Sequence, residues 1–93
     1  MAQIEVEDVP QRHRYEARSG EELLGVALYE REDGVLVLTH TVVEKAAEGH
    51  GVGSALARTA LDTARGQGLR VLPRCPFMAG WIDRHPEYAD LVA

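Results

Sequence analysis

A cluster of three glycines near the middle of the chain is the feature that most constrains how it can fold. Gly49, Gly51 and Gly53 occupy alternate positions between the apolar segment 35–43 and the segment 52–64. In that second segment apolar side chains recur at helical spacing. A loop of this kind at a helix start leaves backbone N–H groups free to bind an anion. The sequence therefore predicts a strand, an anion-binding loop and a helix in succession.

The residues before the loop have the pattern of an antiparallel meander of three or four strands. The segments with strand-like periodicity are 3–8, 12–18, 22–30 and 35–43. The second is polar, which favours an edge strand, whereas the third is apolar enough for a central strand. Within it, Gly25 marks a bulge or a close backbone approach. Asp33-Gly34 is a strong hairpin signal that joins the last two strands.

The residues after the loop predict a helix, one further strand and short C-terminal helices. The helix ends near Gly66 and Gly68, and within it Arg65 lies three residues after Asp62, the spacing of a local ion pair. Residues 69–73 form a strand parallel to 35–43, because a helix crosses between the two. Pro76 starts a helix and Pro86 starts a last short turn. The whole is a single α/β (α+β) domain, residues 1–93, with Phe77, Trp81 and Tyr88 as core anchors.

Charge and composition exclude several classes of partner. The formal net charge is −5, so neither a nucleic acid nor an anionic membrane is an expected partner. The acidic N-terminus lacks the pattern of a secretory leader, and no apolar run is long enough to span a membrane. A single cysteine excludes an internal disulfide framework, which favours the reducing cytoplasm. We expect a monomer or weak homodimer that holds no metal.

Three kinds of phosphate-binding loop compete for the glycine cluster. A P-loop requires Gly-Lys-Ser/Thr at its end, and here Gly53-Ser54 has no lysine between them. A dinucleotide loop requires a third glycine where this chain has Ser54, and an acid near the end of the next strand, where it has Arg74. The remaining candidate is a loop that binds the pyrophosphate of an acyl-coenzyme A.

Five segments resemble a small, single-domain branch of the GNAT N-acetyltransferase superfamily. They are His40-Thr41-x-Val43, Glu48-Gly49-His50-Gly51-Val52-Gly53, Pro73-x-Cys75-Pro76-Phe77, Trp81-Ile82 and His85-Pro86-Glu87-Tyr88. The glycine loop is similar to the superfamily's Gln/Arg-x-x-Gly-x-Gly/Ala motif. The resemblance implies a GNAT-like fold, acetyl-CoA or coenzyme A as cofactor, and transfer of an acetyl group to an amine. The cofactor-binding residues that it implies are Thr41, Val42, Val43, Glu48, Gly49, His50, Gly51, Val52, Gly53, Ser54 and Cys75.

One residue departs from that motif. Glu48 stands where the superfamily usually has Gln or Arg, and an acid beside a pyrophosphate repels it. Either Glu48 points away, toward Arg58 or Lys45, or this chain binds CoA more weakly than its relatives. A partial positive charge on His50 would offset some of the repulsion.

Two residues are candidates for the chemistry. His40, on a strand that lines the cleft in the resembled fold, is a candidate general base, although a histidine there can equally serve packing alone. Cys75 follows a strand end, stands at a helix start and neighbours Arg74, all of which favour a reactive sulfur over a buried structural thiol. It would either protonate the departing CoA or receive the acetyl group first. The alternatives to an enzyme are a CoA-binding regulatory module with little turnover and an interaction protein that has lost the ligand.

Overall fold

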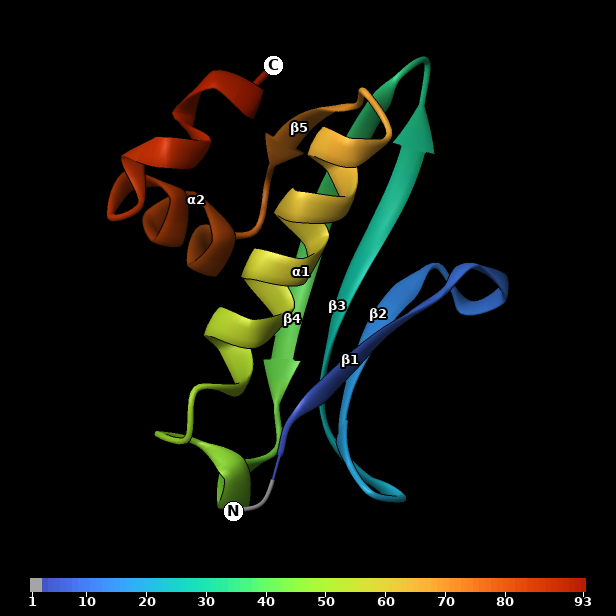
Figure 1. The fold of residues 1–93 in the computed structure, drawn as a ribbon, viewed down its shortest axis with the longest axis vertical. Coiled ribbons are helices and arrows are strands. Elements are labelled where there is room, and N and C mark those ends of the chain that lie inside the picture. The colour runs from blue at the N-terminus through green and yellow to red at the C-terminus, as the bar shows by residue number, and fades with distance from the viewer. Residues whose placement is uncertain (1–2) are drawn as a thin grey trace.

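The N-terminal half of the chain forms an antiparallel meander that leads into the glycine loop. In the computed structural model, which describes residues 3–93, its strands are β1 (Glu5–Val9), β2 (Arg14–Ser19), β3 (Glu22–Glu32) and β4 (Val35–Val43). A fifth strand, β5 (Arg70–Pro73), pairs with β4 in parallel. The sheet order is β1-β2-β3-β4-β5, so neighbours in sequence are neighbours in space (Figure 1).

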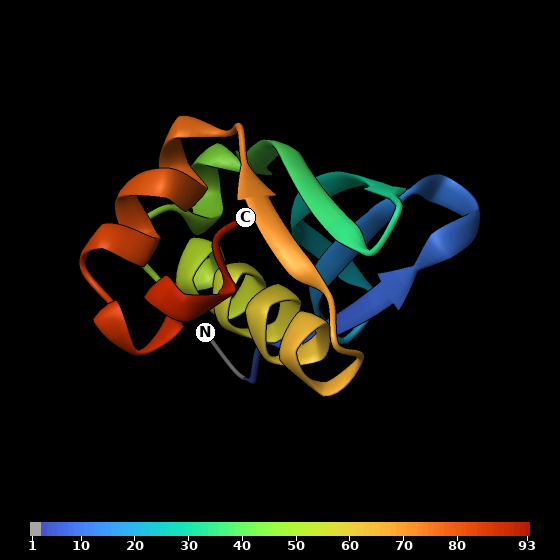
Figure 2. The ribbon, with the colours of Figure 1, turned by 90° about the horizontal axis from the view of Figure 1, so that it is seen from above.

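The helices cover one face of this sheet. They are α1 (Val52–Gly66) and α2 (Pro76–Asp83). The chain also forms short 3-10 turns, η1 (Pro10–Arg12), η2 (Lys45–Ala47) and η3 (Pro86–Leu91). Helix α1 contacts all five strands, and α2 and η3 pack beside it near β5 (Figures 1 and 2). Within residues 3–93, no helix lies on the opposite face of the sheet (Figure 2).

The predicted fold class, the parallel last strand and the central position of β3 are confirmed, but the prediction that 12–18 is an edge strand is wrong. Strand β2 lies between β1 and β3, and β1 forms the edge of the sheet. Tyr15 and Ala17 are buried under α1, whereas Arg14 and Arg18 project from the uncovered face. The polar residues of β2 therefore lie on the uncovered face of the sheet. A strand with one uncovered face alternates polar and apolar side chains just as an edge strand does.

Helix α1 is held on the sheet by a stripe of small and branched apolar side chains. Its buried residues are Val52, Leu56, Ala57, Ala60, Leu61 and Ala64. The alanines let the helix approach the strands closely, and each fully buried leucine contributes on the order of 2 kcal/mol to folding. The apolar residues that recur at helical spacing in the sequence thus face the core.

Gly25 fixes where the start of α1 rests on the sheet. A Cβ on this residue would lie 2.8 Å from the Val42 carbonyl oxygen and 3.0 Å from Val52 Cγ1. Both expectations for Gly25 are met, because the backbones approach closely here and the β2–β3 register shifts beside it, between Ala17 and Arg18. The absence of a side chain lets Val52, the first residue of α1, pack directly onto β3 and β4.

Candidate functional site

Strands β4 and β5 part half-way along β4. Their last paired residues are Leu38 and Pro73, and the Leu38 carbonyl then accepts hydrogen bonds from the N–H groups of both Arg74 and Cys75, each at 3.0 Å. The β3–β4 register also shifts here, which leaves Thr39 outside the backbone register, although its Oγ1 donates to the Leu28 carbonyl of β3 at 3.3 Å. Beyond this point β4 pairs with β3 alone.

The free edge of β4 presents backbone donors and acceptors to the gap. The Glu44 N–H donates to the Leu24 carbonyl of β3 at 2.8 Å. Because successive residues of a strand direct their N–H and C=O groups to opposite sides, those of Val43 and Thr41 point away from β3. The gap between β4 and β5 is therefore lined on one side by backbone groups able to pair with an extended ligand.

The glycine loop brings unpaired N–H groups to the end of the same gap. Gly49 and Gly51 have φ angles of +83° and +84°, which side chains other than glycine rarely adopt. The first hydrogen bond of α1 runs from the Ala55 N–H to the Gly51 carbonyl, at 3.0 Å. The N–H groups of residues 52–54 precede that bond, so they are free and carry the positive end of the helix dipole. These free donors lie where the sequence predicts an anion-binding loop.

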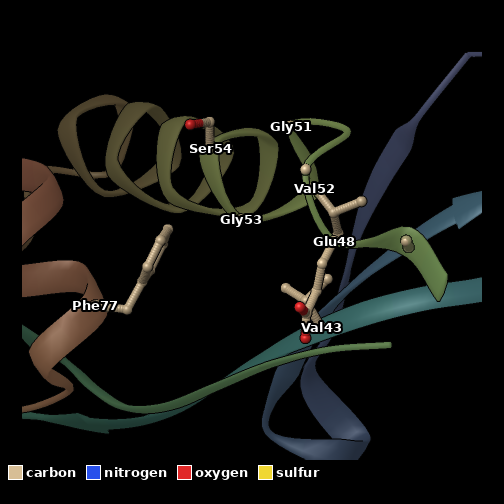
Figure 3. A pocket seen from close by; sticks show the side chains of 9 residues that line it. Val43, Glu48, Gly51, Val52, Gly53, Ser54 and Phe77 are labelled. Carbon is tan, nitrogen blue, oxygen red and sulfur yellow. The ribbon is translucent and has the colours of Figure 1, made fainter. Parts of the chain in front are cut away.

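Gly53, in contrast, is needed for packing. It lies inside α1 with φ outside the left-handed region, but a Cβ on it would come within 2.6 Å of Phe77 Cζ. The Phe77 ring extends from the first turn of α2 toward Gly53 and spans the opening between the two helices (Figure 3). Phe77 is not the core anchor that we expected, since it is 38% exposed.

These elements enclose a pocket of about 250 Å³. Its lining residues are Val43, Ala47, Glu48, Gly49, Gly51, Val52, Gly53, Ser54 and Phe77 (Figure 3). Val43 and Phe77 form apolar walls, and the start of α1 supplies the donors. The only charged lining residue is Glu48, and no cationic side chain is among the walls, so the backbone N–H groups are the pocket's only positive groups.

The structure brings most of the predicted cofactor residues together and separates the rest. Val43, Glu48, Ser54 and the three loop glycines line the pocket, as does Val52. His50 is exposed and does not line it. Thr41 and Cys75 lie further along the gap, outside the pocket.

Thr41 and Cys75 meet where the strands part. The buried Cys75 thiol donates a hydrogen bond to Thr41 Oγ1 across 3.2 Å, and the first turn of α2 follows directly. The sulfur is therefore held at the inner end of the gap.

His40 and Val42 lie on the other face of β4. They pair with Leu28 and Val26 of β3 and alternate with Thr41, so their side chains project from the uncovered side of the sheet. Both are exposed, Val42 to 54%. The structure thus places the two candidate catalytic residues on opposite sides of β4, His40 on the uncovered face of the sheet and Cys75 on the face that the helices cover.

Several residues around the site were not predicted from the sequence. Ala47 and Phe77 line the pocket, and Trp81 donates a hydrogen bond from Nε1 to Ser54 Oγ at 3.0 Å. Arg58 lies over the Trp81 ring. Phe77 follows Cys75-Pro76 directly, and Arg58 comes four residues after Ser54, so position along the helices could have indicated both.

A family model described as GCN5-related N-acetyl-transferase matches residues 14–91. The chain belongs to the GCN5-related N-acetyltransferase family. The match includes β2 to β5, the glycine loop, both α-helices and η3. Acetyl transfer is the activity that this family membership supports.

One solved structure shares the GCN5-related fold over the whole chain. It is the solution structure of a GCN5-like, suspected N-acetyltransferase from Staphylococcus aureus, with a TM-score of 0.76 and 20% sequence identity. The similarity covers 100% of this chain and 91% of that protein. No curated protein sequence matches the chain. Among residues 3–93, no helix has both the length and the apolar character to cross a membrane.

Proposed function

We propose that this protein is an acetyl-CoA-dependent N-acetyltransferase that acts on an amine. One observation carries the proposal: the free edge of β4 and the unpaired N–H groups of the glycine loop meet at the same pocket. A ligand with an extended amide-containing arm and a pyrophosphate matches both features. Membership of the GCN5-related family supports acetyl transfer, and the cofactor and the amine acceptor are our proposal.

The residues present fit acetyl-CoA, which would supply the acetyl group as an activated thioester. The N–H groups of residues 52–54 would hold its pyrophosphate, and the free backbone groups of Thr41 and Val43 would pair with its pantetheine arm. Phe77 and Val43 would exclude water from that arm. Glu48 is the one lining residue whose charge opposes binding.

His40 would act from the opposite side of the strand. It is exposed on the uncovered sheet face, where an acceptor amine can approach without displacing a helix. A neutral imidazole there accepts the proton of the attacking amine. The absence of a helical cover in residues 3–93 suits an acceptor on a protein or peptide better than an enclosed metabolite.

Cys75, at the inner end of the gap, has two possible roles that one experiment separates. It would either donate its proton to the departing CoA thiolate or receive the acetyl group and pass it on. In the second case, intact-mass measurement after mixing with acetyl-CoA shows an acetyl adduct that Cys75→Ser lacks. If no adduct forms at any time point while acetyl transfer proceeds, the covalent route is excluded.

The assay for the function itself is acetyl transfer to a panel of lysine peptides and small amines, followed by mass spectrometry. Sustained transfer that His40→Ala slows supports the proposal. Glu48 within the pocket favours the alternative, a CoA-binding regulatory module. That alternative requires CoA binding with no transfer to any amine, and an affinity that His40→Ala leaves unchanged.

A further inference from the structure

Trp81 connects the core to two exposed groups beside the pocket. The indole is 2% exposed, and its Nε1–H donates to Ser54 Oγ at 3.0 Å. Its ring centroid lies 5.3 Å from Arg58 Cζ, within cation–π range. Ser54 and Arg58 are both exposed residues of α1. One buried side chain of α2 therefore contacts two polar groups on the surface of α1.

The indole hydrogen bond determines what the Ser54 hydroxyl can do. An indole nitrogen can only donate, so Ser54 must accept, and its own hydrogen remains available for another partner. Within residues 3–93, no protein group accepts that hydrogen. Figure 3 shows the hydroxyl leaving α1 on the side away from Phe77. Ser54 is thus a fixed donor at the edge of the pocket, one turn into the helix.

Arg58 lies one helical turn beyond Ser54 on the same flank. His85 stacks on Trp81 with ring centroids 3.6 Å apart and an interplanar angle of 9°, which fixes the indole and leaves its other face to Arg58. Arg58 Nη1 also donates to the Tyr88 hydroxyl at 3.4 Å. The guanidinium of this exposed residue is therefore held by Trp81 and Tyr88.

We propose that Trp81 is a positioning residue that holds Ser54 and Arg58 as a phosphate-binding pair on the α1 flank of the pocket. The ligand groups are the phosphates of the nucleotide half of CoA, so the inference rests on the proposed function. The pocket walls carry a carboxylate, Glu48, and no cation. Arg58 supplies the positive charge that the walls lack, and Ser54 adds a directed hydrogen bond.

The test measures affinity for three ligands: CoA, dephospho-CoA, which lacks the 3′-phosphate, and pantetheine, which lacks all phosphates. Trp81→Phe removes the indole N–H and keeps an aromatic ring; Ser54→Ala removes the hydroxyl. We expect each to weaken CoA binding about tenfold, the effect of losing a hydrogen bond to a charged group. The double variant should lose no more than either single one, and Ser54→Thr should retain affinity.

Arg58→Gln tests the contribution of the Arg58 charge, and Arg65→Gln is its matched control. Both remove one exposed arginine from the same flank of α1, but Arg65 lies two turns further on and binds Asp90. Arg58→Gln should weaken CoA binding about fivefold at low salt, and Arg65→Gln should leave it unchanged. Because Ser54 and Arg58 are exposed, their variants test the proposal even if Trp81→Phe fails to fold.

The ligands separate the possible outcomes. A loss confined to CoA assigns the pair to the 3′-phosphate, and an equal loss for CoA and dephospho-CoA assigns it to the pyrophosphate. Weakened pantetheine binding in Trp81→Phe or Ser54→Ala, measured by chemical-shift titration, would show a structural role and overturn the proposal. So would wild-type CoA affinity in these variants. Failure of the wild-type protein to bind CoA at all would instead refute the proposed function.

Discussion

The three loop glycines serve two different physical purposes. Gly49 and Gly51 adopt positive φ angles, so any side chain there would strain the backbone of the loop. Gly53 has no such need and instead makes room for the Phe77 ring. At the residue scale, two of the glycines therefore permit the backbone conformation of the loop, and the third permits the packing of α2 against α1.

Gly53→Ala tests the packing purpose. The new methyl group would overlap Phe77 Cζ, so we expect a loss of about 1 kcal/mol in the free energy of unfolding, measured by urea denaturation. In a Phe77→Ala background the overlap disappears. The same substitution should then stabilise the protein by about 0.5 kcal/mol through helix propensity.

Gly66→Ala is the control for that cycle. Gly66 belongs to the same helix, and an added Cβ would meet no atom within 4 Å. It should have the same effect whether or not Phe77 is present. Additive effects of Gly53→Ala and Phe77→Ala would show that the ring does not depend on the missing side chain.

Glu48→Gln tests the one unfavourable charge in the pocket. Removing the carboxylate should tighten CoA binding about threefold at low ionic strength, because like charges separated by several ångströms in a solvated site repel by up to about 1 kcal/mol. The gain should shrink as salt is added. Calorimetric titration at two salt concentrations measures both effects.

The control is Glu44→Gln, which removes an exposed acid of the same segment that does not line the pocket. An equal gain from both variants would mean that overall charge, rather than position in the pocket, governs affinity.

At the scale of the elements, a cluster of charged side chains lies on the uncovered face of the sheet. Glu16 of β2 is 3% exposed and accepts hydrogen bonds from Arg12 at 3.3 Å, Arg14 at 2.8 Å and Arg18 at 2.9 Å. The bonds from Arg18 and Arg14 outweigh the cost of burial and lower the pKa of Glu16 from 4.5 to about 2. This cluster is what makes β2 polar.

A depressed carboxyl pKa makes stability depend on pH in a defined interval. The contribution of Glu16 is complete above pH 4.5 and is lost as the pH falls toward 2, because the unfolded chain then binds the proton first. Glu16→Gln should lower the free energy of unfolding by about 2 kcal/mol at pH 7. It should also flatten the fall in stability between these two pH values, as followed by urea denaturation.

Glu7→Gln provides the comparison. Glu7 pairs with Glu16 in the β1–β2 register and is exposed on the same face. Its removal should leave the shape of the pH profile unchanged. Parallel profiles for wild-type protein and Glu16→Gln would contradict the assignment to Glu16.

At the scale of the whole molecule, the C-terminal segment is bound to α1 and β5. Arg65 of α1 bonds Asp90 and the Glu87 carbonyl, and the Ala93 N–H donates to the Val71 carbonyl of β5. These bonds keep η3 against α1 and β5. Helix α2 packs against η3, α1 and β5. A ligand that contacts β4, α1 and α2 together would therefore stabilise the entire fold.

A thermal-shift panel tests this coupling. Acetyl-CoA or CoA at one hundred times its dissociation constant should add about 2.7 kcal/mol to stability. For a domain of this size that raises Tm by about 10 °C or more. NAD and ATP, supplied at equal concentration, should give smaller shifts because neither has the pantetheine arm. A shift with NAD or ATP but none with CoA would overturn the proposed function.

The sequence by itself determined those features that depend on local periodicity and turn chemistry. Alternation along the strands, the Asp33-Gly34 turn and the helical stripe of α1 follow from neighbouring residues, so the meander, the crossover helix and the parallel strand were predictable. The glycine loop before α1 was too, because positive φ at Gly49 and Gly51 is a property of the backbone itself. That the loop binds an anion stays a prediction. Cytoplasmic location, oligomeric state and partners stay predictions.

Only the tertiary structure decided which surfaces those elements expose and which side chains meet. A strand at the edge of a sheet and a strand in a sheet with one uncovered face show the same alternation of polar and apolar side chains. For this reason β2 was wrongly predicted to be an edge strand. Asp62 and Arg65 have the spacing of a local ion pair. Asp62 instead accepts a hydrogen bond from the Tyr88 hydroxyl, and Arg65 forms an ion pair with Asp90. These pairings join residues more than twenty positions apart, and local spacing carries no information about them. The separation of His40 from Cys75 and the contact of Trp81 with Ser54 likewise come from packing alone.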